Sequence, residues 1–271
     1  MDRCALDAGS SAIMTPPIAL VTGAGRGLGL AIADRLRADG FETIGLDVDG
    51  AAGTVVCDVT DHAAVEALIG SLSSAPTAVV NNAGIVRFGS LLDVSDVEFR
   101  RVVEVNLTGT FTVARLAARR MVADGMHGSI VNITSINGVS PGLNSGAYGS
   151  TKAAVALLTR QMALEWGVHG IRVNAVAPGL IDAGMSEPIY ADPDARAARS
   201  GRVPLGRLGT SDDIASAVAF LLSNEASYIT GTEIIVDGGV VQSAISSLPR
   251  PRSVDGVGVP TNAWSTAGVR A

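Results

Sequence analysis

The stretch that decides the fold is Ile18-Ala19-Leu20-Val21-Thr22-Gly23-Ala24-Gly25-Arg26-Gly27-Leu28-Gly29. It is a short apolar run that ends in a glycine-rich turn, and Leu28, Ile32 and Leu36 then follow at helical spacing. Glycines between a strand and a helix let the backbone approach a pyrophosphate, and the helix start supplies free N–H groups and a positive dipole end. The spacing is Gly-x-x-x-Gly-x-Gly rather than Gly-x-Gly-x-x-Gly. Such a turn can simply connect strand to helix, but its position favours dinucleotide binding.

The rest of the chain alternates apolar runs with helical patterns. We expect strands over residues 18–22, 41–46, 54–57, 78–80, 129–135, 171–177 and 233–236, and helices over 28–36, 63–69, 107–121, 148–166 and 214–222. This alternation through short turns predicts an α/β fold: a single-domain, Rossmann-like, doubly wound parallel sheet of seven strands. Residues 182–203 have no clean period and contain Pro188 and Pro193, which predicts a mobile loop or lid.

Composition excludes several classes of function. Of 271 residues, 47% are hydrophobic and 17% are charged, so a large core can be buried. The formal net charge of −6 argues against a nucleic-acid partner or an anionic membrane surface. The two cysteines, Cys4 and Cys57, form no Cys-x-x-Cys motif, so neither redox nor zinc chemistry is supported and no metal is expected. This usage fits a reducing cytosol, and we expect a cytoplasmic protein.

Tyr148 and Lys152 stand at i and i+4, which places both side chains on one face of a helix. An ammonium beside a phenol favours the phenolate, so we expect the pKa of Tyr148 to fall below its usual value near 10. A tyrosine tuned in this way can transfer a proton at neutral pH. Alone, the pattern also describes a Tyr/Lys pair on a solvated helix face. Ser135, thirteen residues upstream, ends an expected strand, where open α/β sheets place ligands.

Asp47 lies at the end of the second expected strand, twenty residues after Gly27. That position suits a carboxylate that binds the adenosine ribose hydroxyls and repels a 2′-phosphate, so it favours NAD over NADP. Asp47 is also a residue type that turns favour, so it can be structural instead. Arg26 can accommodate a 2′-phosphate, which keeps NADP open as the cofactor. Asn81-Asn82-Ala83-Gly84 follows the fourth strand and reads either as a turn or as space for a ribose, while Asn106 reads as a cap or a satisfied amide.

Taken in order, these motifs resemble the short-chain dehydrogenase/reductase family, single-domain branch, over residues 18 to about 241. The matching positions are Thr22-Gly23-x3-Gly27-x-Gly29, Asn81-Asn82-Ala83-Gly84, Asn106, Ser135, Tyr148-x3-Lys152, Pro178-Gly179 and Asp237-Gly238-Gly239. The resemblance implies an NAD(H)-dependent enzyme that interconverts a secondary alcohol and a ketone by hydride transfer.

The resemblance also implies a role for each position. Tyr148 is the catalytic acid/base, Ser135 binds the reacting oxygen, Lys152 holds the nicotinamide ribose, and Asn106 anchors a water at the end of a proton relay. The implied cofactor contacts are Gly23, Arg26, Gly27 and Leu28 at the pyrophosphate, Asp47, Asp58 and Val59 at the adenosine end, Asn82 near the ribose, and Pro178 and Ile181 beside the nicotinamide, with Tyr148 and Lys152. Where the family often has Thr, this chain has Ala183, which implies a weaker grip on the cofactor.

Alternative functions stay open beside this one. An NADPH-dependent 3-oxoacyl-[acyl-carrier-protein] reductase looks similar over most of the chain; Asp47 argues against it and Arg26 for it. Carbon–carbon double-bond reductases of the same fold space the tyrosine and lysine more widely. A non-catalytic NAD sensor commonly lacks one of them, and this chain has both. Similar proteins pair their two long helices between subunits, which implies a homotetramer.

The substrate itself cannot be read from the sequence. Candidate pocket residues are mostly apolar and hint at a hydrophobic or cyclic secondary alcohol, although lid packing explains them equally well. They are Val86, Phe88, Val139, Leu143, Met185, Ile189 and Tyr190.

We divide the chain into a leader over residues 1–17, a catalytic domain over 18–243 and a tail over 244–271. The leader has no apolar segment typical of a signal peptide. Because Met14 directly precedes the first expected strand, the leader is either dispensable or the product of an upstream start. The tail is rich in proline and glycine, which predicts disorder. Packing of Trp264 on a neighbouring subunit is the alternative.

Overall fold

The protein is described by a computed structural model that covers residues 16–243, 253–254 and 257–258. Its centre is a parallel seven-stranded sheet in the order β3-β2-β1-β4-β5-β6-β7, which confirms the predicted doubly wound fold. The strands are β1 (Ile18–Thr22), β2 (Glu42–Asp47), β3 (Val55–Val56), β4 (Ala78–Asn81), β5 (Gly128–Ile133), β6 (Ile171–Pro178) and β7 (Glu233–Val236).

The strand order reverses beside β1, and this reversal determines where a ligand can bind. β1 pairs with β2 on one side and with β4 on the other, and both pairings are parallel. The connections from β1 to β2 and from β4 onward therefore leave toward opposite sides. A crevice opens at the carboxyl ends of the strands at such a switch point.

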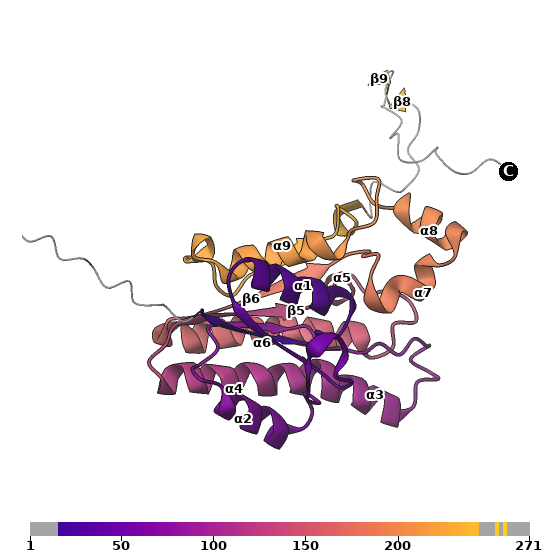
Figure 1. Ribbon diagram of the computed structural model, residues 1–271. Helices are drawn as coiled ribbons and strands as arrows, with labels where there is room; N and C mark the ends of the chain where they lie inside the picture. Colours follow the sequence, from indigo (N-terminus) through magenta and orange to yellow (C-terminus); the bar gives the residue numbers. More distant parts are fainter. Residues whose placement is uncertain (1–15, 244–252, 255–256, 259–271) are drawn as a thin grey trace, which may run out of the picture.

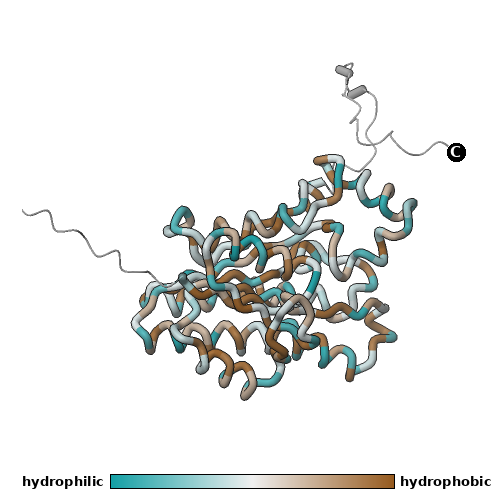
Figure 2. The backbone as a smooth tube through the Cα atoms, viewed as in Figure 1, coloured by the Kyte–Doolittle hydropathy of each residue, from teal (hydrophilic) through white to brown (hydrophobic). Residues whose placement is uncertain are grey.

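Helices cover both faces of the sheet (Figure 1). On one face, α1 (Gly27–Ala38) and α9 (Ser211–Leu222) pack together over Val21, Val80 and Val131. On the other face lie α2 (His62–Ser71), α4 (Thr110–Ala123) and α6 (Tyr148–Trp166), which bury Leu20 and Ile130. Both faces of the inner strands are thus covered, which is why β1 and β4 are buried along their whole length, and hydrophobic colours gather in the middle of the molecule in Figure 2.

The long helical stretch before β5 is longer than the sequence pattern predicts. α3 (Asp96–Val103) begins at a Ser95 cap and continues through a π-helical turn, Glu104–Gly109, into α4. Gly109 lets this turn approach the segment after β3, because a Cβ there would lie 2.7 Å from a methyl of Val59. The π turn carries Asn106, so the irregularity lies next to the predicted site.

Residues 182–203, predicted to form a mobile loop or lid, contain regular helical structure. This segment forms a 3₁₀ turn, Gly184–Ser186, followed by α7 (Glu187–Tyr190) and α8 (Pro193–Ser200). Asp192 caps α8 through its side chain, and the prolines stand in the first turns, where a missing N–H is harmless. The helices are too short for their periodicity to appear in the sequence.

Short elements complete the described chain. They are a four-residue helix α5 (Ile136–Val139), 3₁₀ turns at Ala51–Gly53, Gly167–His169, Asn224–Ala226 and Val241–Ser243, and an antiparallel pair of β8 (Ser253–Val254) with β9 (Val257–Gly258). That pair falls within the predicted tail. Residues 1–15 of the predicted leader and Trp264 lie outside the described residues.

Candidate active site

A cleft of about 1020 Å³ runs along the carboxyl ends of the strands, from the glycine turn to Tyr148. All the residues predicted to contact the cofactor line this cleft, and so do Ser135, Tyr148 and Lys152. The cofactor contacts in question are Gly23, Arg26, Gly27, Leu28, Asp47, Asp58, Val59, Asn82, Pro178 and Ile181. The fold therefore brings these residues to one continuous cavity, whereas Asn106 and Asp237-Gly238-Gly239 do not line it.

The glycine turn after β1 leaves no room for a side chain at its glycine positions. Gly23 and Gly27 have φ angles of +65° and +53°, and a Cβ on Gly29 would lie 2.0 Å from the carbonyl oxygen of Gly23. Asn82 holds the turn against β4, since its Nδ2 donates to the carbonyls of Thr22 at 3.0 Å and Gly23 at 3.1 Å. This bare, fixed backbone at the start of α1 fits a pyrophosphate group.

Asp47 is held in the cleft by the backbone. Its Oδ2 accepts from the N–H of Gly25 at 2.8 Å, and its Oδ1 accepts from the N–H of Val48 at 2.7 Å. The carboxylate is therefore fixed beside the glycine turn at the end of β2. Arg26 is exposed and lines the same end of the cleft. The Asp47 carboxylate and the Arg26 side chain, which have opposite effects on a 2′-phosphate, therefore lie at the same end.

Asp58 lies farther along this end, after β3. Desolvation raises the pKa of Asp58, but hydrogen bonds from Thr60 and the charge of Arg101 outweigh it, so the pKa lies below its usual value. Arg101 Nη2 lies 3.2 Å from Asp58 Oδ2. This ion pair fixes the wall of the cleft between β3 and α3.

At the opposite end, Tyr148 begins α6 and Lys152 follows one turn later. Lys152 is buried and its Nζ donates to the carbonyl of Ile133 at 2.7 Å, while lying 5.6 Å from the centre of the Tyr148 ring. Ser135 does not extend β5 as predicted; it caps α5, accepting from the N–H of Asn137 at 3.2 Å. Its hydroxyl also hydrogen-bonds Tyr148. The three side chains therefore converge.

The predicted fall in the pKa of Tyr148 is wrong for this structure. Desolvation by burial raises the pKa of Tyr148, and the hydrogen bond from Ser135 only partly opposes the rise. Burial also lowers the pKa of Lys152 from 10.5 to about 8. The sequence shows the spacing of the pair but not its burial, and here burial is the larger effect. Tyr148 is thus a protonated phenol at neutral pH.

Asn106 lies behind the cleft rather than on its wall. Its Oδ1 accepts from the N–H of Ile85 at 2.8 Å, and its Nδ2 donates to the carbonyl of Ile85 at 2.9 Å and to the hydroxyl of Thr151 at 3.2 Å. A Cβ on Gly84 would lie 3.3 Å from Asn106 Oδ1 and 3.6 Å from Lys152 Nζ. Asn106 therefore ties the loop after β4 to α6, close to the lysine.

The wall beyond Tyr148 is mostly apolar. Six of the seven predicted pocket residues line it: Val86, Phe88, Leu143, Met185, Ile189 and Tyr190. Val139, the last residue of α5, does not line the cleft. Sequence reasoning missed Asn137, Glu187 and Arg199, which also line the cleft. They come from α5, α7 and α8, short helices that the sequence pattern did not reveal.

The described residues contain neither a candidate metal site nor a candidate membrane-spanning helix. Among them, no group of three His, Cys, Asp or Glu side chains could hold a metal ion. Within the same part of the chain, none of the helices combines the length and apolar character needed to cross a membrane.

The chain matches a family model described as "Enoyl-(Acyl carrier protein) reductase" over residues 23–241. Among curated proteins it is similar to 3beta-hydroxysteroid dehydrogenase 1 of Eggerthella lenta, with 37% identity over 240 residues that cover 82% of this chain and 92% of that protein.

Solved structures give the same picture. A protein assigned as a 2-deoxy-D-gluconate 3-dehydrogenase from Agrobacterium tumefaciens, with bound NADP, has 36% identity and a TM-score of 0.78 over 83% of this chain and 96% of that chain. A 4-hydroxyisoleucine dehydrogenase complexed with NADH has 30% identity and a TM-score of 0.79, covering 83% of this chain and 99% of that chain.

Proposed function

Because the chain belongs to the short-chain dehydrogenase/reductase family, we propose that Tyr148, Ser135 and Lys152 carry its chemistry and that NAD is its preferred cofactor. The protein is an NAD(P)-dependent oxidoreductase that acts on CH–OH groups and their ketones. The single observation that supports the assigned roles is the convergence of these three side chains in a cleft that continues to the glycine turn.

Each side chain has a step that its geometry allows. A bound nicotinamide dinucleotide supplies or accepts the hydride. Tyr148 gives its phenolic proton to the oxygen of a ketone, or as phenolate takes the proton of an alcohol. Ser135 donates a hydrogen bond to that oxygen, and the Lys152 ammonium stabilises the negative charge that develops there in a largely water-free site. The raised pKa keeps Tyr148 protonated at neutral pH, so the phenolate that takes a proton from an alcohol becomes more populated, and oxidation speeds up, as the pH rises.

Asn106 has a supporting role in this proposal. Its side-chain atoms hydrogen-bond Ile85 and Thr151, so Asn106 fixes the position of α6. In this proposal the water relay ends near Lys152, beside Asn106. It acts on the reaction by holding other groups in place.

The proposed preference for NAD depends on Asp47. Two backbone N–H groups fix its carboxylate at the end of β2, where a 2′-phosphate would meet negative charge. Arg26 is exposed and can turn away from the cleft. In the alternative function, an NADPH-dependent 3-oxoacyl-[acyl-carrier-protein] reductase, attraction of the 2′-phosphate by Arg26 would have to outweigh its repulsion by Asp47.

A substrate screen tests the proposal. Purified protein is mixed with a panel of cyclic and linear secondary alcohols and with their ketones, and reduced-nicotinamide absorbance is followed with NAD⁺ and NADP⁺ in parallel. We expect turnover with NAD⁺ at lower concentrations than with NADP⁺. The Ser135→Ala variant should lose most of the rate, because the reacting oxygen loses a donor, whereas Ser243→Ala, outside the cleft, should keep it. A strong preference for NADPH would overturn the cofactor assignment.

A double-bond reductase and a sensor make different predictions in the same screen. The family model is described as an enoyl reductase, but Tyr148 and Lys152 are one helical turn apart, closer than in the double-bond reductases. An enoyl reductase would consume NADH with unsaturated thioesters and not with ketones. A sensor would bind NAD and turn over none of these compounds.

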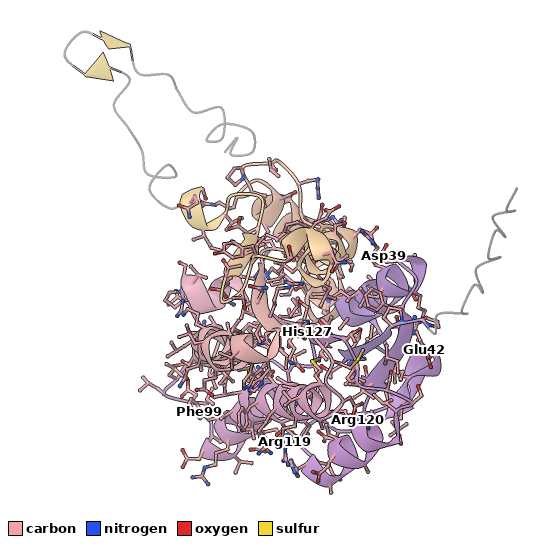
Figure 3. All side chains as sticks on the ribbon, turned by 90° about the vertical axis from the view of Figure 1, so that its left-hand side faces the viewer. Asp39, Glu42, Phe99, Arg119, Arg120 and His127 are labelled. Atoms are coloured by element: carbon pink, nitrogen blue, oxygen red, sulfur yellow. The ribbon has the colours of Figure 1, made fainter. Side chains whose placement is uncertain are left out.

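We also propose a cytoplasmic homotetramer. Large apolar side chains are exposed on the outer sides of α4 and α6: Phe111, Leu157 and Leu164, with Val168 beyond the helix end. Phe99 on α3 and Arg119 and Arg120 on α4 are labelled on this layer in Figure 3. Burying such a surface against a second copy removes apolar area from water. Cys57 is a free, buried thiol, in keeping with a reducing compartment.

A further inference from the structure

The positive charges that line the cleft are not all accounted for by the cofactor. Arg101 pairs with Asp58, and Lys152 donates to the Ile133 carbonyl. Arg26 stands beside the glycine turn, where the pyrophosphate is proposed to lie. Arg199 is the remaining cation on the cleft wall within the described part of the chain, and neither the mechanism nor the cofactor uses it.

Arg199 lies on α8 against the apolar end of the cleft. The carbon of its guanidinium group is 5.8 Å from the centre of the Tyr190 ring, and Tyr190, itself only 5% exposed, also lines the cleft. A cation over an aromatic face is held in place without using its N–H donors. Arg199 is thus oriented at the wall by a buried ring while its donors stay available.

No carboxylate of the described residues lies within ion-pair distance of Arg199. One turn earlier on the same helix, Arg196 is paired with Asp182, and Arg207 is paired with Asp213. Of the acidic residues on the cleft wall, Asp47 and Asp58 belong to the adenosine end, and Glu187 accepts from the N–H of Gly184 at 2.8 Å. The apolar end of the cleft therefore has one oriented cation with no carboxylate of the described residues within ion-pair distance.

We propose that the substrate carries an anionic group, a carboxylate or a phosphate, that Arg199 binds. This inference rests on the proposed function, which places the reacting carbon at Tyr148. Phe88, Leu143 and Met185 line the cavity with apolar side chains, so an apolar chain or ring connects the hydroxyl to the acid. Arg199 is a specificity-determining residue: it selects acidic secondary alcohols over their neutral analogues and takes no part in proton transfer.

Matched substrates test the inference. One arm compares secondary hydroxy acids of increasing chain length with their methyl esters, and a second compares 3-hydroxyacyl thioesters of coenzyme A with those of N-acetylcysteamine, which has no phosphate. In the wild-type protein kcat/KM should be about tenfold higher for the acidic member of one arm, mainly through KM, and the preference should weaken at high salt. The arm that shows the preference identifies a carboxylate or a phosphate as the anion.

Two variants locate the effect. Arg199→Gln should remove the preference for the acidic member and leave turnover of the neutral member within about twofold, and Arg199→Lys should restore part of it. Arg202→Gln is the matched control, because Arg202 is exposed, lies three residues away and does not line the cleft. The same preference in Arg199→Gln as in the wild type, or a wild type that prefers neutral substrates in both arms, would overturn the inference and leave the oxidoreductase function intact. No turnover of any member by the wild type would overturn the proposed function, and this inference with it.

Discussion

Replacing Lys152 by Met should stabilise the protein at neutral pH. The pKa of Lys152 is about 8 in the folded chain and 10.5 without the surrounding protein, so burial of its charge opposes folding. A gap of 10.5 − 8 = 2.5 corresponds to about 3 kcal/mol at pH 7. Met leaves the Ile133 carbonyl without its donor, which reduces the gain in the free energy of unfolding by about 1 kcal/mol. The net expectation is a gain of about 2 kcal/mol in the free energy of unfolding.

The pH dependence identifies the cause. Because the folded pKa is depressed, the wild type regains stability as the pH rises from 8 toward 10.5, while the variant has no such group to titrate. The difference between the two proteins should therefore change by about 2–3 kcal/mol between pH 7 and pH 10, and the variant should lose its advantage.

Urea denaturation of both proteins at a series of pH values measures this difference. Lys152 is the only lysine in the chain, so lysine labelled with ¹³C at Cε gives one resonance whose titration reports its pKa directly. A stability difference that stays constant from pH 7 to pH 10, or a resonance that titrates near 10.5, would refute the reasoning.

Three further predictions each concern the surroundings of one side chain. Gly29→Ala should destabilise the fold by about 2–4 kcal/mol in urea denaturation, because its Cβ would meet the Gly23 carbonyl at 2.0 Å, whereas Gly70→Ala, in open space on α2, should stabilise it by about 0.5–1 kcal/mol. Asp47→Asn should raise the ratio of kcat/KM for NADP⁺ to that for NAD⁺ about tenfold, since it removes the charge but keeps the acceptor for Gly25; an unchanged ratio would show that Asp47 does not select the cofactor. Leu164→Glu should convert the proposed tetramer into smaller species in sedimentation velocity at micromolar concentration without unfolding, because this side chain is 82% exposed in the single chain; a wild type that is already a monomer would contradict the assembly.

The sheet could be predicted from the sequence because both of its faces are buried. The central strand β1 is then an apolar run, and the glycine turn after Thr22 fixes the first strand-to-helix connection. The residues of the cleft were found for a similar reason: motifs that follow strand ends come together at one edge of a parallel sheet.

What the sequence did not reveal depends on packing. α7 and α8 are too short to show a period, so their helical structure and the place of Arg199 were missed. The pKa of Tyr148 depends on how far burial outweighs its neighbours, and no spacing of residues contains that information. Val139 is apolar, like the other predicted pocket residues, but it is the last residue of a four-residue helix and is partly exposed away from the cleft wall.

Turnover by a Tyr148→Phe variant tests the central claim most directly. The change removes one hydroxyl from the ring that converges with Ser135 and Lys152, and Tyr228→Phe, on a fully exposed tyrosine outside the cleft, is the matched control. With the best alcohol from the screen, Tyr148→Phe should lose a factor of about 10² to 10⁴ in kcat while NADH still binds within a few-fold of the wild-type affinity, and Tyr228→Phe should match the wild type. A Tyr148→Phe protein that turns over at the wild-type rate would contradict the assignment.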